Sequence, residues 1–502
     1  MKFSLSKLTV GAMYLITVCT SPAQTAPKFK MTTELPPGIA SPDQVETRLG
    51  TLKFFDGFPD DASVEKLYDN LDFQRAVQAY LLAIPAVSQA ANRNEILKLG
   101  PANTTVPIFE ERMDSKSVFL TPNTQTPYSW MWLDLRQGPI VLESPPKVLG
   151  AINDMWYRWV VDIGFTGPDK GEGGKFLILP PGYKGEIPDG YFVVKSPTFS
   201  LWAPWRSFVV KGDPKPGVDL VKKHTRVYRL ADAANPPTMK FVNVSGKDFC
   251  TVAPADDAFW TLLNQVVQEE PSESLDPIRL GFYTSIGIEK GRPFAPDARM
   301  KKILTEAAAV GDATARAIAF RMRQKAAFYY EGSSWQLPFI GGYQFQTQPG
   351  VLNLDAYIYY YFMATGVTPA METKMVGEGS QYAWTGTDSA GNPLDGGKSY
   401  KLRLPPTVPV NNFWSVILYD NQARSMVQTD QRFPSISSQQ EDLVVNADGS
   451  IDIHFGPKAP AGKANWIQTV PGKGWNTILR LYGALEPWFD KTWQPGEIEP
   501  IQ

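Results

Sequence analysis

Histidine and cysteine are scarce in this chain of 502 residues. The two histidines are His224 and His454, far apart in the sequence, and the two cysteines are Cys19 and Cys250. Few general bases are therefore present for a Ser-His-Asp site, and no G-x-S-x-G elbow occurs. So few nitrogen and sulfur ligands cannot build a zinc site by themselves. We therefore expect no metal and no cofactor. The alternative is an all-oxygen calcium site in the Gly-rich loop that holds Asp388, Asn392 and Asp395.

Charge is also low. Only 20% of residues are charged and the formal net charge is −2. This balance gives no basic surface for nucleic acid and no polybasic patch for an anionic membrane. After the N-terminus no apolar run approaches the ~18 residues that a membrane-spanning helix needs. We expect no nucleic-acid partner and no transmembrane segment in the mature chain, while a homo-oligomer is compatible with the sequence.

The N-terminus has the pattern of a signal peptide. Lys2 and Lys7 precede a short apolar stretch, residues 8–18, and small residues follow at 21–23. The apolar stretch is too short to span a bilayer. We predict a signal peptide over residues 1–23 and a periplasmic or secreted, soluble protein, in which Cys250 has no disulfide partner. The alternatives are a buried N-terminal helix and a lipoprotein anchored at Cys19.

Aromatic residues, proline and glycine are plentiful, which is typical of a β-rich protein with many turns. The pattern changes along the chain between helical spacing and short strands. Pro85 is expected to break the first helix. The predicted segments are an irregular arm (24–60), a helical segment (61–116), a first β-rich lobe (117–250), a helical middle segment (251–370) and a second β-rich lobe (371–502).

An internal repeat links the two β-rich lobes. Residues 142–146 (LESPP) are followed by Trp156 and Asp162, and residues 402–406 (LRLPP) are followed by Trp414 and Asp420. We interpret this as duplication of one β unit, with chance similarity between aromatic strands as the alternative. The sequence thus predicts an α+β fold with two related antiparallel β-sandwich, jelly-roll-like lobes, a helical N-terminal segment and a helical middle segment.

The last third of the chain is dense in aromatic residues and arginine. Aromatic rings provide contact area for a ligand, and an arginine fork binds carboxylates. Arg480 is notable because it lies inside an apolar run (478–482), where a charge needs a partner. The candidate ligand-binding residues are Trp414, Asp420, Arg424, Trp475, Arg480 and Tyr482. The alternative is that each tryptophan belongs to a core and that Asp420 is a turn residue.

Several motifs resemble a bacterial two-domain family. They are residues 122–128 (PNTQTPY), 412–416 (NFWSV), 424–426 (RSM), 448–450 (DGS) and 472–475 (GKGW). The halves of this family are domains of unknown function numbered twelve fifty-four (N-terminal) and twelve fourteen (C-terminal). The resemblance covers roughly residues 70–490. It implies an exported protein with helices beside β-sandwich lobes, and because it implies no established activity it supplies no catalytic residues.

The leading hypothesis for function is binding of a polar, sugar-like or carboxylate-bearing small molecule. The site would lie at the C-terminal lobe or in the cleft between the lobes. One alternative is a cofactor-independent hydrolase or lyase that uses carboxylate and Arg/Tyr residues. Another is a surface interaction protein, which a large exposed apolar patch would favour.

Overall fold

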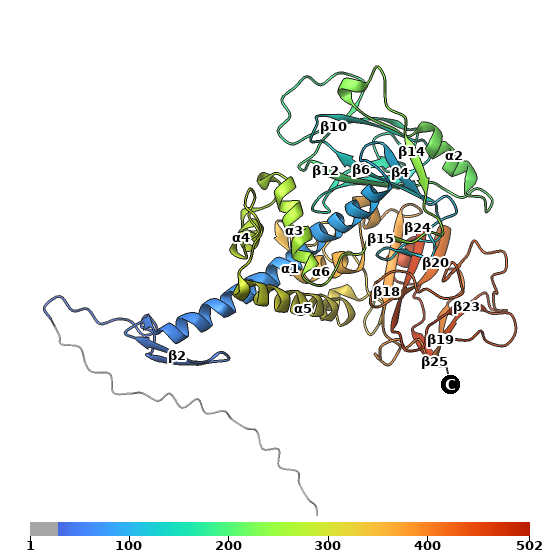
Figure 1. Cartoon of the computed structure of the whole chain (residues 1–502). Helices are drawn as coiled ribbons and strands as arrows, with labels where there is room; N and C mark the ends of the chain where they lie inside the picture. The colour runs from blue at the N-terminus through green and yellow to red at the C-terminus, as the bar shows by residue number, and fades with distance from the viewer. Residues whose placement is uncertain (1–28, 502) are drawn as a thin grey trace, which may run out of the picture. The chain divides into compact units, whose positions relative to one another are not determined.

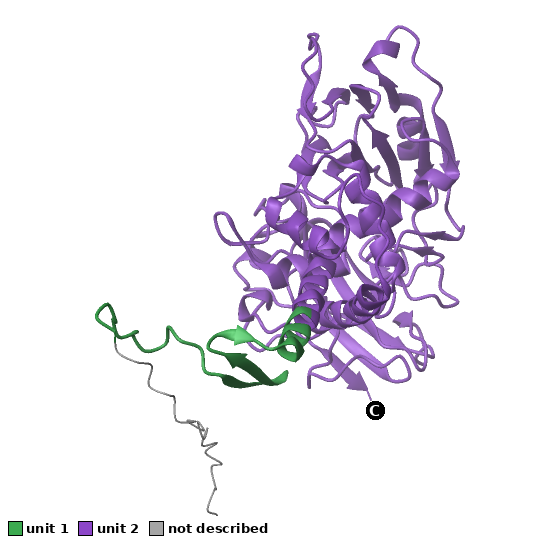
Figure 2. Cartoon of the chain, turned by 60° about the vertical axis from the view of Figure 1, so that its left-hand side comes forward, with its two compact units in different colours: residues 1–68 green, residues 69–502 purple. Residues whose placement is uncertain are grey.

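The computed structural model describes residues 29–501, so the predicted signal peptide and Cys19 lie outside the described residues. The chain divides into two compact units, residues 1–68 and 69–502 (Figure 2). Helices and strands of several sheets occur together, which confirms the mixed α+β class. Within the described residues, no helix combines the length and the apolar character needed to cross a membrane.

The first unit contains a small antiparallel sheet where the sequence predicted only an irregular arm. Its strands are β1 (Gln44–Thr47), β2 (Gly50–Phe55) and β3 (Phe58–Pro59). The Ser63 hydroxyl accepts a hydrogen bond from the backbone N–H of Lys53 at 2.8 Å. The prediction of an irregular arm was wrong for these residues. The strands are marked in the sequence by the turns between them and not by alternating hydrophobic residues.

Helix α1 (Asp61–Leu99) runs through Pro85 without interruption, so the predicted break was wrong. A proline inside a helix removes one hydrogen bond and costs about 3 kcal/mol. Here Ile84, Pro85 and Ala86 are all buried. Tertiary packing of these side chains offsets the local cost. The helix also ends at Leu99, earlier than the predicted helical segment (61–116).

The first β-rich half contains two larger sheets. Their orders are β14-β4-β6-β12-β8-β9 and β11-β10-β7-β13. Side chains from both sheets form one hydrophobic cluster. The strands are β4 (Thr105–Ile108), β6 (Tyr128–Asp134), β7 (Ile140–Ser144), β8 (Leu149–Asp154), β9 (Trp159–Gly164), β10 (Gly174–Leu179), β11 (Phe192–Lys195), β12 (Ser200–Arg206), β13 (Arg226–Arg229) and β14 (Lys240–Asn243), and helix α2 (Lys215–His224) lies between β12 and β13.

The second β-rich half also contains two sheets, in the orders β18-β24-β20-β21 and β23-β22-β19-β25. Again one cluster takes side chains from both sheets. The strands are β18 (Ser380–Thr385), β19 (Ser399–Leu404), β20 (Val410–Asp420), β21 (Ser435–Ser437), β22 (Ile451–Gly456), β23 (Asn465–Gln468), β24 (Trp475–Ala484) and β25 (Ile498–Ile501). Figure 1 shows this half in orange and red, apart from the blue-green strands of the first half.

The two halves repeat one strand arrangement. Strands β6 to β13 correspond, in chain order, to β18 to β25: β6-β12-β8-β9 has the order of β18-β24-β20-β21, and β11-β10-β7-β13 that of β23-β22-β19-β25. The directions agree as well, since β10–β11 and β22–β23 are both parallel pairs, while the other pairs among these corresponding strands are antiparallel. The two Pro-Pro pairs follow the equivalent strands β7 and β19. The equivalence of Asp162 with Asp420 was wrong, because Asp162 lies in β9 whereas Asp420 ends β20, the counterpart of β8.

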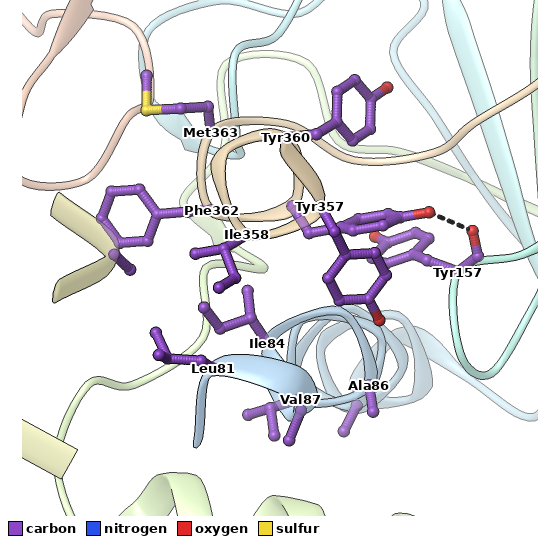
Figure 3. Close-up of a cluster of buried hydrophobic side chains, with 14 of the residues drawn as sticks. Leu81, Ile84, Ala86, Val87, Tyr157, Tyr357, Ile358, Tyr360, Phe362 and Met363 are labelled. Carbon is purple, nitrogen blue, oxygen red and sulfur yellow. Dashed lines mark hydrogen bonds between the residues drawn. The ribbon is translucent and has the colours of Figure 1, made fainter. Parts of the chain in front are cut away.

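Helices pack against both halves. They are α3 (Ala258–Glu269), α4 (Pro277–Ser285), α5 (Ala298–Phe320) and α6 (Leu354–Met363), with α1 running among them. The Asn353 side chain caps α6 by accepting a hydrogen bond from Ala356 N–H. Helix α6 is apolar on all sides, as expected of a buried helix. In Figure 3 its Ile358 lies toward Ile84 of α1, whereas Tyr360 points away from α1.

Glu270 directly follows α3 and is almost fully buried (1% exposed). Its carboxylate accepts hydrogen bonds from the backbone N–H groups of Phe199 (2.6 Å) and Ser200 (3.1 Å). Burial is the largest influence on this group and raises its pKa to about 7, despite those hydrogen bonds. A buried acid that prefers to be neutral makes folding depend on pH.

We expect Glu270 to lower stability as pH rises. Its folded pKa lies above the ordinary 4.5, so its contribution is complete below about pH 4.5 and is lost as pH rises through about 7. The rise of the pKa from 4.5 to about 7 corresponds to roughly 3 kcal/mol. Glu270→Gln cannot ionise and should lose this component of the pH dependence. Urea unfolding of both proteins between pH 4.5 and 8 measures it, and identical pH slopes would contradict the expectation.

Candidate functional site

A cavity of about 190 Å³ lies between the two β-rich halves. Strands β6, β8 and β12 line it from the first half, and β18 and β24 line it from the second. The connection that follows α6, residues 364–371, contributes a further wall. The volume is below the ~300–1,000 Å³ of typical drug-sized sites. The cavity is therefore suited to a small molecule rather than to a polymer or a dinucleotide.

The alternation of side chains along the strands determines the cavity walls. On β6, Met131 and Leu133 belong to the core between the sheets, so Trp130 and Trp132 point to the opposite face. On β24, Leu479 and Leu481 belong to the core of the second half. Ile478 and Arg480 consequently face the cavity. Tyr360, on the side of α6 away from α1, also lines it (Figure 3).

Arg480 is the most deeply buried charge at the cavity, with 7% of its surface exposed. Its Nη2 atom donates to the carbonyl oxygen of Thr121 (2.6 Å) and to the hydroxyl of Tyr419 (3.0 Å). Its guanidinium lies 5.3 Å from the centre of the Tyr382 ring. Within the described residues its Nε atom has no hydrogen-bond partner, and no carboxylate pairs with it.

The charge of Arg480 is retained. Burial acts to lower its pKa, but the neighbouring tyrosine oxygens, with Tyr419 first, outweigh burial and raise the pKa above the ordinary value. The side chain is therefore a permanent cation whose hydrogen-bond partners are neutral. Such a cation is costly to bury unless an anion approaches it.

Arg206, the last residue of β12, is a second cation at the cavity and is half-buried. Its Nη2 atom donates to the Ser380 hydroxyl at 3.3 Å, and its guanidinium lies 5.3 Å from the centre of the Tyr482 ring. As with Arg480, no ion pair to a carboxylate is found within residues 29–501. Two arginines thus contact the cavity without an acidic partner.

The structure does not bring the six predicted site residues together. Only Arg480 lines the cavity. Trp414 (3% exposed) and Trp475 (1%) lie in the core between the two sheets of the second half, which leaves no ring face for a ligand. The Tyr482 ring is covered by the Arg206 guanidinium, which lies 5.3 Å from its centre. It also stacks on Phe413, with 4.1 Å between ring centres.

Arg424 and Asp420 lie elsewhere. Arg424 donates from Nε to the carbonyl oxygen of Phe362 (3.2 Å), and burial lowers its pKa to about 10. Asp420 accepts hydrogen bonds from the backbone N–H groups of Gln422 and Ala423, both at 2.8 Å. Asp420 therefore shapes the turn after β20, the alternative that the sequence had left open.

Sequence reasoning missed Arg206 and the aromatic residues around it. A signal was available, because Arg206 ends an apolar run (LWAPWR) much as Arg480 interrupts one. The missed residues that line the cavity include Tyr128, Trp130, Arg206, Tyr382 and Trp384. Their importance depends on how the halves pack, which sequence spacing does not specify.

Among residues 29–501, no group of three or more His, Cys, Asp or Glu side chains is placed to hold a metal ion. Asp388, considered in the sequence for its Gly-rich loop, accepts hydrogen bonds from the N–H groups of Ala390 and Asn392. It therefore stabilises a turn.

Comparison with known proteins places these halves in described domains. Residues 103–229 match the family model Protein of unknown function (DUF1254), and residues 379–486 match Protein of unknown function (DUF1214). The two matches cover most strands of the first and second repeated sets, respectively. No curated protein matches the chain.

Two solved structures are similar. The VPA0106 protein from Vibrio parahaemolyticus is 20% identical with a TM-score of 0.52, and the match covers 86% of this chain and 100% of that one. An uncharacterised protein from Burkholderia cenocepacia is 14% identical with a TM-score of 0.41, over 87% and 96%. The first likeness supports the fold alone. The chain is a two-domain protein in which a DUF1254 domain precedes a DUF1214 domain, both of unknown function.

Proposed function

We propose that the protein binds a small organic acid in the cavity between its halves. Arg480 holds the carboxylate, Arg206 adds a second positive charge at the cavity, and the surrounding aromatic rings hold a planar, apolar body. The observation that carries this proposal is the pair of arginines at the cavity that have no carboxylate partner among residues 29–501. An arginine fork matches a carboxylate in shape and charge.

The cavity walls favour an acid with an apolar body over a sugar-like ligand. Several polar side chains of the lining are already engaged: Asn153 donates to the carbonyl oxygen of Val367 (2.8 Å), Thr368 to Asp162 (2.6 Å) and Thr121 to the carbonyl oxygen of Met363 (3.1 Å). A sugar would leave many hydroxyl groups without partners against Trp130 and Trp384. A planar apolar group makes favourable contacts there.

Binding is also better supported than the enzyme alternative. A hydrolase or lyase that uses paired carboxylates needs two acidic side chains beside the bound substrate. The described residues that line the cavity include no Asp and no Glu. A concave cavity of about 190 Å³ likewise suits a small ligand better than a protein partner.

Two further features belong to this proposal. We place the protein in the periplasm or outside the cell, on the support of the N-terminal signal pattern. We also infer that each half is a jelly-roll-like sandwich. The support is that both sheets of a half contribute side chains to one core cluster.

Calorimetry with benzoate tests the proposal, with the neutral benzamide as a matched compound. Benzoate should bind and raise the melting temperature, whereas benzamide should bind far more weakly. Arg480→Met should weaken benzoate binding at least about tenfold, since hydrogen bonds to charged groups contribute ~1.5–3 kcal/mol. The control is Arg136→Met, because Arg136 is exposed and pairs with Asp134 outside the cavity. Absence of benzoate binding, or equal binding by Arg480→Met, would contradict the proposal.

A further inference from the structure

The two arginines occupy equivalent positions in the repeated halves. Across β8 and β12, Asp154 pairs with Leu201 and Leu149 pairs with Arg206. Across β20 and β24, Asp420 pairs with Trp475 and Ser415 pairs with Arg480. The spacing from the strand-ending aspartate to the arginine is the same in both halves. Arg206 and Arg480 are therefore counterparts.

The aromatic neighbours are repeated as well. On the other side of β12, Arg206 pairs with Tyr128 and Pro204 pairs with Trp130. On the other side of β24, Arg480 pairs with Tyr382 and Ile478 pairs with Trp384. In each half, a strand with the pattern Tyr-x-Trp (β6 or β18) therefore pairs with a strand that carries the arginine (β12 or β24). All six of these tyrosines, tryptophans and arginines line the same cavity, so both copies of the repeated unit contribute to one site.

Charge balance indicates what such a cavity holds. Each copy brings one arginine, and the described lining contains no acidic side chain. A single carboxylate would neutralise one of the two cations and leave the other without an anion. A ligand with two negative charges compensates both, and electrostatic complementarity of this kind provides specificity.

On the basis of the function proposed above, we infer that the ligand is a planar dicarboxylate, with one carboxylate at the arginine of each half. Trp130 and Trp384 contact the apolar centre between the two acidic groups. Because each arginine fork matches one planar carboxylate, two arginines favour two carboxylates over one doubly charged group. The ligand class is an aromatic or unsaturated dicarboxylic acid.

Calorimetry at constant ionic strength with terephthalate, benzoate and phenyl phosphate tests this inference. Terephthalate should bind the wild-type protein at least about tenfold more tightly than benzoate, one charge-assisted contact being worth ~1.5–3 kcal/mol. Arg206→Met or Arg480→Met should each reduce terephthalate to the affinity of benzoate. The double variant should bind neither acid. Arg136→Met is the control, and circular dichroism verifies folding.

The outcomes separate the two proposals. Equal affinities for benzoate and terephthalate, with Arg480→Met weakening both, would overturn the dicarboxylate and leave organic-acid binding intact. Tighter binding of phenyl phosphate than of terephthalate would overturn it in favour of one doubly charged group. Failure of all three compounds to bind would overturn both proposals. If a Met variant does not fold, Arg206→Lys or Arg480→Lys keeps the charge, loses the fork, and should still weaken terephthalate more than benzoate.

Discussion

Trp475→Ala is expected to lower the free energy of unfolding by about 3–5 kcal/mol, the usual cost of removing a fully buried aromatic side chain. Trp475 is 1% exposed. Its ring stacks on Phe455 with 4.8 Å between centres and meets the edge of Tyr400 at 5.6 Å. These contacts lie in the core of the second half, so a cavity would form between its two sheets. Urea unfolding followed by circular dichroism measures the loss.

Trp466→Ala is the matched control. Trp466 lies on β23, is half-buried, and its Nε1 donates to the carbonyl oxygen of Gly456 at 3.0 Å. A clearly smaller loss of stability is expected there. Had Trp475 been a ligand-binding residue, as the sequence suggested, its substitution would weaken binding in a protein of unchanged stability. That result would contradict the assignment of Trp475 to the core.

Asp154→Ala is expected to lower the free energy of unfolding by about 2–4 kcal/mol, because each buried backbone N–H left without an acceptor costs ~1–3 kcal/mol. Asp154 is fully buried and accepts hydrogen bonds from the N–H groups of Trp156 and Arg158, both at 2.9 Å, and from Arg158 Nε at 2.7 Å. Burial raises its pKa although Arg158 opposes this. Removing the side chain leaves these donors without an acceptor beside the cavity. Chemical denaturation measures the change.

The counterpart Asp420→Ala provides an internal comparison. Asp420 caps the turn after β20 in the same way, but its ion-pair partner Lys473 is largely exposed at a 3.0 Å separation. Water can replace the lost contacts there, so a cost of about 1 kcal/mol is expected. Equal losses at the two positions would show that burial does not control the contribution of these turns.

The repeat could be found in the sequence because short-range features mark it. The two Pro-Pro pairs end equivalent strands, and proline cannot continue a strand ladder. The spacing gave wrong equivalences for individual residues. Trp156 lies in the turn after β8, whereas Trp414 lies within β20. Turn lengths differ between the halves, and sequence spacing alone does not separate a strand residue from a turn residue.

The site was only partly predictable for the same reason. Arg480 was identified because a charge within an apolar strand needs a partner. Trp414 and Trp475 belong to the same sheet as Arg480 and were predicted with it. Their side chains nevertheless point to the other side of that sheet, into the core of the second half. Alternation assigns residues to two faces. It does not show which face is packed against the other sheet and which faces a cavity.

By itself the sequence determined the mixed fold class, the two related domains and the presence of a buried arginine, because composition, turn residues and strand patterns are local properties. Only the tertiary structure decided that Arg206 joins Arg480, that both lack an acidic partner within residues 29–501, and that the tryptophans divide between core and cavity. Those outcomes depend on contacts between residues far apart in the sequence, such as that of Arg480 with Thr121, 359 positions away. Packing of the two halves creates such contacts, and local patterning does not encode them.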